Sequence, residues 1–579
     1  MARWVWAVIA VWVGSLAAAG DAPIGTVIDN VTLKDIRYLP RTLDDFGQPK
    51  VLVLAFITNT CPLARRYLPK LVELDREFAP QGVQFLVVNV GPDDAIMDVA
   101  YHALEFQAPF PMLKDMTGNA VRKLGMTRTP EVAVLDAQRA LRYRGRVDDQ
   151  YRLGGVKPTV GRADLREAIM AVLAGKEVEV STTPADGCSI TFPPQPAPDP
   201  RFTYAEHIAP ILNARCAACH HDGGSAPFAL TSLKKAAAHA EMIAEVVGEG
   251  RMPPWYAHPE FGTFENERRL TPREKSLLLT WVASGCPEGD AAQAPASPVF
   301  EDNGWAFVPD AIIEASTEIA LPASGFVDYR YVFLPYEVQE DTWVRAIQIL
   351  ASNPRVLHHA NLFFQSADGK FERAKHFLTG TVPGNLPRPL PEGMALLLPK
   401  GAKLGLQIHY VTTGKPETDR PRVGVLLSKS PVRQRVYYKI LDDESFKIPP
   451  GDPMFAVRGA AAMEEDVSVV ALFGHMHLRG RDMTFRAKYL DGREEILLCL
   501  PNYSFDWQLS YYPPLGQMKL AKGAELECVA HFDNSRLNPY NPDPAKTVEY
   551  GPQTVDEMMQ GFIFYTRDNE ALSTTSDGG

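Results

Sequence analysis

Two cysteines and a histidine between positions 216 and 220 form the most specific chemical motif of the chain. Cys216-Ala217-Ala218-Cys219-His220 has the spacing C-x-x-C-H, which attaches a c-type haem through two thioethers and one axial imidazole. A disulfide or half of a zinc site could also use such cysteines, but no second Cys/His pair follows at zinc spacing. The motif therefore predicts a covalently bound haem with His220 as one iron ligand.

The second iron ligand is expected downstream, in Arg251-Met252-Pro253-Pro254-Trp255. A methionine thioether raises the reduction potential of a haem and suits electron transfer. We predict Met252 as this ligand. Three imidazoles are alternatives: His221, His239 and His258.

Five histidines in the C-terminal half lie in apolar, strand-like sequence, where an unsatisfied imidazole would be costly. They are His358, His359, His409, His475 and His477. On a strand, His475 and His477 would share one face with Met476 opposite, a geometry that chelates one metal ion. His358 and His359 would face opposite sides of a regular strand, so their joint use requires a bulge or a strand end.

Cys61 lies between the apolar run Val51–Ile57 and a helical pattern that begins at Leu63. A thiol at a helix N-terminus, with Arg65 and Arg66 nearby, has a lowered pKa and can form a reactive thiolate. Cys61 is therefore a candidate redox thiol. Three roles remain open: a buried thiol in a scaffold or docking domain, a one-cysteine peroxidase, and a thiol that receives copper.

Proline-rich segments divide the chain of 579 residues, whose length predicts about four domains. The first block alternates strand-like runs (Val51–Ile57, Val83–Val90, Glu131–Leu135) with helical patterns (Leu63–Phe78, Leu165–Ala174), which indicates an α/β sheet. The second is helical, with helices expected at Tyr204–Ala214 and Leu233–Gly248, and the third has short alternating strands typical of β-sandwiches. The expected boundaries are a signal peptide 1–19, an α/β domain 21–178, a linker 179–198, a helical domain 199–289, a linker 290–300, β-domains 301–445 and 446–567, and a polar tail 568–579.

Composition and the N-terminus indicate class and compartment. Hydrophobic residues make up 46% and charged residues 22%, which excludes a largely disordered chain, and a net charge of −11 with scattered basic residues disfavours nucleic-acid binding. Arg3 precedes an apolar run that ends in Ala17-Ala18-Ala19, as in a secretory signal, and the run is shorter than the roughly 20 residues of a membrane span. We expect an exported protein of the bacterial periplasm with no transmembrane segment in the mature chain.

Seven cysteines in an exported protein suggest disulfides. With Cys216 and Cys219 bound to haem, the pairs Cys188–Cys286 and Cys499–Cys528 would leave Cys61 free. Other pairings remain open.

Two blocks resemble known redox families. The first resembles the thioredoxin-like redoxins, since Thr58 stands three residues before Cys61 as in peroxiredoxins and Thr129-Pro130 occupies the place of their cis-proline turn. Cys61-Pro62-Leu63-Ala64 is no C-x-x-C, and the block Asp21 to Lys176 holds no resolving cysteine, which argues against a dithiol cycle. The second block resembles a small class I cytochrome c around its C-x-x-C-H motif.

The third block, roughly Tyr329 to Thr566, resembles the copper type II, ascorbate-dependent monooxygenases, the family of peptidylglycine α-hydroxylating and dopamine β-monooxygenases. Five segments carry the resemblance in order: Val356-Leu357-His358-His359, Leu406-Gln407-Ile408-His409-Tyr410, Gly474-His475-Met476-His477, Asp556-Glu557-Met558 and Phe562-Ile563-Phe564-Tyr565. The resemblance implies two consecutive eight-stranded jelly-rolls and two mononuclear copper sites that face each other across a cleft.

The same resemblance assigns ligands. His358, His359 and His409 would hold the copper that stores electrons, and His475, His477 and Met558 the copper that binds oxygen. Because a thioether favours Cu(I), a methionine suits the oxygen site. Met559 is the substitute for Met558, and Met518 and Met483 are also available.

The sequence departs from that family where peptidylglycine enzymes anchor the substrate carboxylate with Arg, Asn and Tyr. Phe473, Gln560 and Phe562 stand there instead, so a carboxylate would lose its bidentate partner and we expect a less anionic substrate.

The sequence thus predicts a multidomain protein: a thioredoxin-like α/β domain, an all-α cytochrome c domain and two all-β jelly-roll sandwiches. Its expected activity is hydroxylation of a C–H bond of a small molecule with O₂, the electrons passing from an external ascorbate-like reductant or redox protein through the haem. The alternatives are a non-catalytic copper- and haem-binding electron-transfer or copper-handling protein, and a Cys61 thiol peroxidase.

Overall fold

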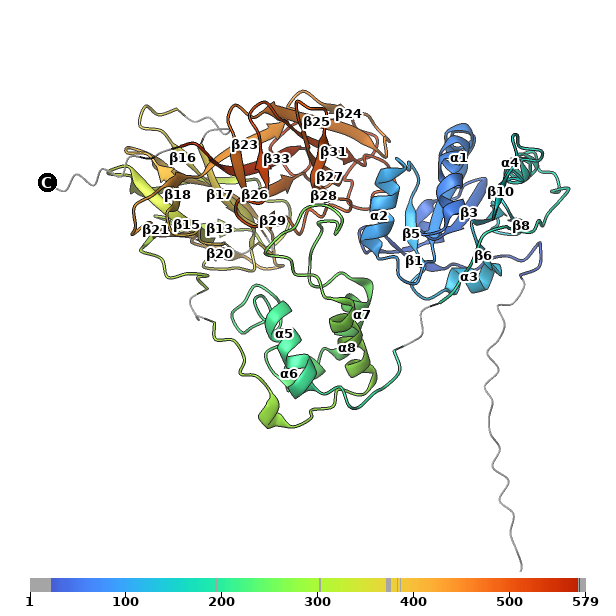
Figure 1. Cartoon of the computed structure of the whole chain (residues 1–579), viewed down its shortest axis with the longest axis horizontal. Coiled ribbons are helices and arrows are strands. Elements are labelled where there is room, and N and C mark those ends of the chain that lie inside the picture. The colour runs from blue at the N-terminus through green and yellow to red at the C-terminus, as the bar shows by residue number, and fades with distance from the viewer. Residues whose placement is uncertain are drawn as a thin grey trace, which may run out of the picture. The chain divides into compact units, whose positions relative to one another are not determined.

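The computed structural model describes residues 22–192, 196–300, 304–370, 376–382, 384–385, 387–570 and 572. The chain divides into two compact units, residues 1–94 with 108–193, and residues 95–107 with 194–579 (Figure 1). The expected signal peptide 1–19 and most of the expected tail lie outside the described residues. Within the described ranges, no helix is both long and apolar enough to cross a membrane.

The first unit contains a seven-stranded sheet in the order β2-β1-β5-β4-β3-β7-β8. Its strands are β1 Thr32–Asp35, β2 Pro40–Thr42, β3 Val51–Ile57, β4 Val83–Asn89, β5 Met112–Lys114, β7 Glu131–Asp136 and β8 Leu141–Gly145, and its helices are α1 Pro62–Phe78, α3 Asn119–Leu124 and α4 Asp164–Leu173. The central strands β3, β4 and β5 run parallel, and β3 and β4 are buried at every residue, as continuous apolar runs require. The predicted strands and helices of this block are confirmed, and the fold is thioredoxin-like.

A two-residue strand, β11 (Cys188–Ser189), pairs with β6 (Arg128–Thr129). The segment 179–198, expected to be a linker, therefore contributes a strand to the first unit. Gly187 makes this possible, because its φ is +148° and a Cβ there would lie 2.0 Å from the Thr129 carbonyl oxygen. The unit also carries a β-hairpin of β9 (Tyr151–Arg152) and β10 (Gly155–Val156).

The second unit begins with α2 (Ile96–Glu105) and a helical segment. That segment holds a π-helical turn η3 (Tyr204–Ile208), α5 (Ala209–Arg215), α6 (Leu233–Ala237), α7 (Ala240–Glu249) and α8 (Pro272–Ala283). Its core gathers around Trp281, which is fully buried with Ile208 and Leu212. A capping box fixes the start of α8, since Glu274 N–H donates to Thr271 Oγ1 and Thr271 N–H donates to Glu274. The helix expected at Leu233–Gly248 is interrupted between α6 and α7.

The first β-sandwich has a five-stranded sheet, β12-β21-β15-β18-β22, and a four-stranded sheet, β14-β19-β16-β17. Ile347 and Val425 of one sheet pack with Leu362 and Leu406 of the other in one buried core, as in a sandwich. The strands are β12 Ala311–Glu314, β14 Arg330–Glu337, β15 Thr342–Leu350, β16 Leu357–Gln365, β17 Phe377–Thr381, β18 Met394–Leu398, β19 Lys403–Tyr410, β21 Arg422–Leu427 and β22 Gln434–Arg435, with a separate pair β13 Ile319–Leu321 and β20 Glu417–Asp419.

The second β-sandwich pairs the sheet β23-β33-β26-β29, to which β30 adds through β26, with the sheet β25-β31-β27-β28. Its strands are β23 Tyr437–Asp442, β25 Phe455–Ala462, β26 Val467–His475, β27 Gly480–Lys488, β28 Glu494–Leu500, β29 Ser510–Tyr511, β30 Lys519–Leu520, β31 Glu525–Phe532 and β33 Gln560–Arg567, beside a small pair β24 Lys447–Ile448 and β32 Val548–Glu549. Because β22 pairs with β18 of the first sandwich and β23 with β33 of the second, the sandwiches meet near residue 436 rather than at the expected 445.

The disulfide Cys499–Cys528 considered from the sequence is wrong. Cys499 on β28 lies opposite Thr484 of β27, and Cys528 on β31 lies opposite Phe485 of the same strand. Two strand spacings of about 4.8 Å separate the cysteines, and their side chains point to opposite faces of the sheet. A disulfide needs Cα atoms within about 7 Å.

Candidate metal and thiol sites

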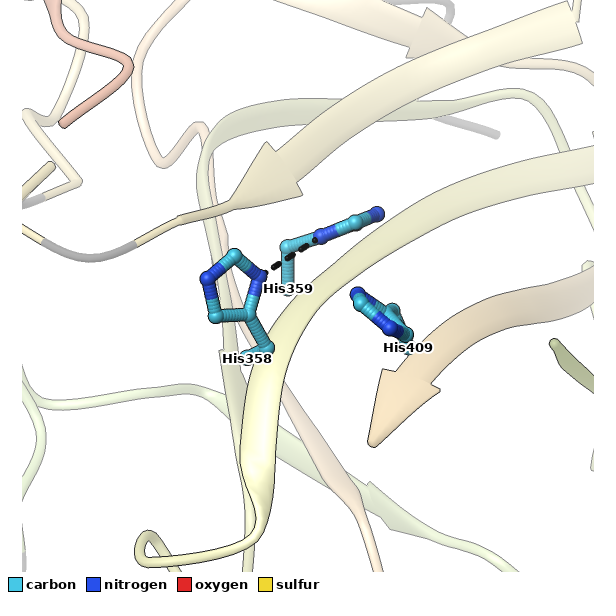
Figure 2. A group of neighbouring side chains, drawn as sticks. All are labelled: His358, His359 and His409. Atoms are coloured by element: carbon cyan, nitrogen blue, oxygen red, sulfur yellow. Dashed lines mark hydrogen bonds between the residues drawn. The ribbon is translucent and has the colours of Figure 1, made fainter. Parts of the chain in front are cut away.

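Three histidines of the first sandwich converge at the ends of two neighbouring strands (Figure 2). His358 and His359 belong to β16 and His409 to β19, and one ligand nitrogen of each lies within 4.8 Å of the others. The register of β16 against β19 shifts between Leu357 and His359, which sets His359 opposite His409. This shift is the predicted bulge, and it lets two consecutive residues face one site.

The ring nitrogens of this cluster are arranged as metal ligands are. His358 Nδ1 lies 3.1 Å from His359 Nδ1, and His359 Nε2 lies 3.0 Å from the Tyr329 hydroxyl. His409 Nδ1 is buried without a hydrogen-bond partner among the described residues. A buried nitrogen left unsatisfied is costly unless something else binds it, and a metal ligand commonly has its other ring nitrogen fixed by a hydrogen bond.

Burial and the neighbouring imidazoles keep His359 and His409 uncharged. Burial lowers the pKa of His359 well below 6.5, and the neighbouring His409 and His358 lower it further. Burial and His358 lower the pKa of His409 to about 4. Neutral imidazole is the form that binds metal ions, so His359 and His409 are in their ligand form at neutral pH.

A second pair of histidines lies at the end of β26. The strand ends at His475, so His477 stands in the turn after it rather than on the predicted strand, yet the two ring centroids are 5.2 Å apart. His475 Nδ1 lies 2.7 Å from Gln508 Oε1 and His477 Nδ1 lies 3.1 Å from the Asp556 carbonyl. Both partners accept, so each Nδ1 is the donor, and Nε2 is the nitrogen that carries the lone pair of the neutral imidazole. Met476 points elsewhere and is fully buried.

Glu557 ties the two ligand segments together. Its carboxylate accepts the backbone N–H groups of His477 at 2.9 Å and Arg479 at 2.7 Å, and Arg479 Nη1 donates to the Val555 carbonyl at 2.9 Å. Burial raises the pKa of Glu557 to about 8, against the lowering effect of these N–H bonds and of the Arg479 guanidinium. The turn that carries His477 is thereby held against the segment that carries Met558.

The methionines proposed as ligands differ in their surroundings, and Met558 faces the cavity described below. It lines this cavity together with His475 and His477. Met559 is fully buried, and a Cβ placed on Gly474 would lie 2.6 Å from the sulfur of Met483, which therefore faces the sandwich interior.

A cavity of about 500 Å³ is lined by one histidine of the first group and by both histidines of the second. His359 lines it from the first sandwich, and His475, His477 and Met558 line it from the second. Phe505 lies between the groups, with its ring centroid 5.3 Å from that of His358 and 6.2 Å from that of His477. Six phenylalanines contribute to the wall: Phe333, Phe363, Phe377, Phe473, Phe562 and Phe564.

The polar groups of this cavity do not favour an anion. Its two arginines are already paired, Arg345 with Glu392 and Arg388 with Glu265. Gln560 is 4% exposed, and its Nε2 has no hydrogen-bond partner in the part of the chain that the structure describes. The wall thus offers an unsatisfied donor and aromatic surface.

The C-x-x-C-H residues form a compact turn after α5. The backbone N–H groups of Cys219 and His220 donate to the Cys216 carbonyl at 3.2 and 2.9 Å. His220 Nδ1 lies 3.0 Å from the Phe228 carbonyl, so it carries the hydrogen and Nε2 has the lone pair that an iron ligand needs. The turn therefore fits covalent haem attachment.

The candidates for the second iron ligand have different surroundings. Met252 follows α7, and its N–H donates to the Val246 carbonyl at 3.2 Å. His239 stacks on Phe228 at 4.0 Å between ring centroids. His221 stacks on Phe300 and His258 packs against Tyr101.

Cys61 occupies the N-cap of α1 and is fully buried. Its thiol donates to the Thr129 carbonyl at 3.0 Å, Thr58 Oγ1 lies 3.4 Å from Thr129 Oγ1, and the Thr129–Pro130 bond is cis, as predicted. Burial raises the pKa of Cys61, but hydrogen bonds from the Ala64 N–H, from Cys188 and from Thr129 outweigh it, so the pKa lies below its ordinary value. Cys188, for which Cys286 was considered as a partner, lies against Cys61.

Sequence reasoning missed four residues of these sites: Cys188, Tyr329, Gln508 and Glu557. Glu557 stands inside a motif and could have been found as the neighbour of Met558. The other three carry no motif and come to the sites through strand pairing or the path of a loop.

Residues 24–144 match the AhpC/TSA family, and no curated protein matches the chain. Among solved structures, a hypothetical protein from Sinorhizobium meliloti 1021 is 31% identical, covers 30% of this chain and 97% of its own, and has a TM-score of 0.28. An uncharacterized conserved protein from Geobacillus kaustophilus is 29% identical over 30% of this chain and 94% of its own, with a TM-score of 0.28. Peroxidoxin BcpB from Mycobacterium tuberculosis is 17% identical over 26% and 94%, with a TM-score of 0.21. The N-terminal domain is a thioredoxin-like redoxin domain, which marks the chain as an oxidoreductase in general terms.

Proposed function

We propose that this chain is a copper-dependent monooxygenase that hydroxylates a C–H bond of a neutral small molecule. The net reaction is RH + O₂ + 2 e⁻ + 2 H⁺ → ROH + H₂O. The single observation that carries the proposal is one cavity lined by His359, a member of the three-histidine cluster, and by His475 and His477. His358, His359 and His409 would hold one copper ion, and His475, His477 and Met558 the other.

The donor chemistry fits copper. Imidazole suits both oxidation states of copper, and a thioether favours Cu(I), the state that meets O₂. Copper bound at the two sites would supply one-electron transfer and oxygen activation. Hydrogen bonds orient two of these imidazole rings: Tyr329 contacts His359, and Gln508 contacts His475.

The cavity indicates the substrate class. Phe473 and Phe562 replace the charged and phenolic anchors of the peptidylglycine enzymes, and the two wall arginines already have acidic partners. An aromatic wall and the unsatisfied Gln560 amide favour an apolar body that carries one hydrogen-bond acceptor, such as a carbonyl or ether oxygen. A carboxylate would meet no spare guanidinium among the described wall residues.

The electron supply belongs to the same proposal. A c-type haem held by Cys216 and Cys219, with His220 and Met252 as iron ligands, would supply a one-electron carrier on the same chain, at high effective concentration. An external ascorbate-like reductant or redox protein would reduce the haem again after each electron transfer. Haem attachment of this kind accords with export to the bacterial periplasm, where we place the protein.

Coupled oxygen consumption tests this function. Copper-loaded full-length protein should consume O₂ and release hydroxylated product in a 1:1 ratio with an aromatic ketone or ether, given ascorbate. The carboxylated analogue of the same molecule should react at least about tenfold more slowly, a difference of about 1.4 kcal/mol in transition-state binding. Copper reduction without coupled product from any neutral substrate would instead indicate a non-catalytic electron-transfer or copper-handling protein.

A second candidate function rests on the redoxin domain, whose family match supports thiol-disulfide oxidoreductase or peroxidase activity. The observation in its favour is Cys61, a buried thiol at a helix N-terminus with a lowered pKa. We propose that Cys61 undergoes thiol redox chemistry. Its test is consumption of hydroperoxide or disulfide that the Cys61→Ser variant loses.

A further inference from the structure

We propose that Cys61 and Cys188 form a reversible dithiol–disulfide pair that exchanges with an external dithiol or disulfide through Cys188. The inference rests on the proposed thiol chemistry of Cys61 and adds the partner that this chemistry needs. It also replaces the one-cysteine peroxidase, one of the three roles that the sequence left open for Cys61.

Strand pairing brings the two thiols together. Cys188 on β11 lies opposite Thr129 on β6, and the Cys61 thiol donates to the carbonyl of the same Thr129. The backbone N–H and the thiol of Cys188 lie close enough to the Cys61 sulfur to lower its pKa. Arg128 Nη1 donates to the Gly187 carbonyl at 2.9 Å and holds β11 in place. Both cysteines thus lie against Thr129, which makes them neighbours for a disulfide.

The two thiols differ in ways that divide their roles. Cys61 is fully buried and its pKa is lowered by the hydrogen bonds that overcome its burial. Cys188 is partly exposed, and its pKa is raised by burial and by the neighbouring Cys61. An external sulfur can therefore reach Cys188, whereas Cys61 is the better leaving group because a thiol of lower pKa leaves faster.

The exchange balances without any further reagent. In oxidation, the Cys188 thiolate attacks a disulfide RSSR, forming Cys188–S–S–R and releasing RS⁻. The Cys61 thiolate then attacks the Cys188 sulfur, which forms the Cys61–Cys188 disulfide and releases a second RS⁻. In reduction, an external dithiol attacks Cys188 and displaces the Cys61 thiolate, and its second thiol then frees Cys188 and closes the external disulfide. Hydrogen bonds to the Cys61 thiolate stabilise the reduced pair, so the disulfide is an oxidising one.

The test treats the full-length protein with oxidised glutathione and maps disulfides by peptide mass spectrometry. The wild type should show a Cys61–Cys188 linkage that dithiothreitol removes. The Cys61→Ser variant should form a stable mixed disulfide between glutathione and Cys188. In the Cys188→Ser variant, the mixed disulfide on Cys61 should form at least about tenfold more slowly, because Cys61 is buried. Cys286→Ser is the matched control and should behave as the wild type does.

Three results would overturn the pair: no Cys61–Cys188 linkage in the wild type, linkage of Cys188 to Cys286, or no glutathione on Cys188 in Cys61→Ser. A different result would separate the two proposals: hydroperoxide consumption that is unchanged in Cys188→Ser and lost in Cys61→Ser. It would support the thiol function of Cys61 and contradict only the Cys61–Cys188 pair. Equal melting temperatures of the cysteine variants show that each result reports chemistry rather than misfolding.

Discussion

Replacing His409 with Ala should abolish coupled hydroxylation while the site of His475, His477 and Met558 still binds one copper ion. His409 supplies one of three converging nitrogens, and its Nδ1 has no other partner among the described residues. Loss of a partner that only orients a metal ligand lowers metal affinity or activity about 10- to 100-fold. Loss of the ligand itself should therefore lower turnover more than about 100-fold. Turnover and O₂ consumption are measured on copper-loaded full-length protein with ascorbate.

The control for this substitution is His207→Ala, which removes an imidazole from the helical segment, where His207 Nδ1 accepts the Thr203 N–H at 3.3 Å. It should leave turnover unchanged. A His409→Ala protein that hydroxylates at the wild-type rate would show that the three-histidine group takes no part in the reaction.

Replacing Glu557 with Ala should destabilise the second sandwich by about 2–6 kcal/mol, since two buried N–H donors lose their acceptor at a cost of about 1–3 kcal/mol each. Glu557 is fully buried, accepts the N–H groups of His477 and Arg479, and lies 3.8 Å from the guanidinium of Arg479. Alanine would leave those donors buried without an acceptor. Calorimetry of the full chain should show one transition lowered by several degrees.

The matched control is Glu549→Ala, since Glu549 forms an exposed ion pair with Lys447 at 2.8 Å. Exposed pairs contribute little to stability, so its transitions should coincide with those of the wild type. Equal shifts for Glu549→Ala and Glu557→Ala would contradict the bracing role of Glu557.

Local pattern predicted much of the first unit. The apolar run Val51–Ile57 has the same first and last residues as strand β3, and the helical pattern Leu63–Phe78 lies within α1. Both were predictable because the hydrophobic pattern of a buried parallel strand or an amphipathic helix is contained in consecutive residues. The need for a bulge or a strand end at His358 and His359 was also predictable, since side chains alternate between the two faces of a regular strand. These are consequences of covalent geometry.

Features that depend on which strands become neighbours were not predictable. β11 has two residues, too few for any periodic signal, yet it carries Cys188 to Cys61. The separation of Cys499 and Cys528 along the sequence allows a disulfide between them, but β27 lies between their two strands. Gln508 reaches His475 from a loop 33 residues away, a contact that no motif records.

The copper content of the purified, copper-loaded chain tests the central claim most directly, measured beside the His475→Ala/His477→Ala variant. The cavity with its two imidazole groups predicts two copper ions per wild-type chain and one in the variant, with the remaining ion lost when His409 is also replaced. No tightly bound copper, or a count that the substitutions leave unchanged, would contradict the account and leave Cys61 and Cys188 as the chemistry of this protein.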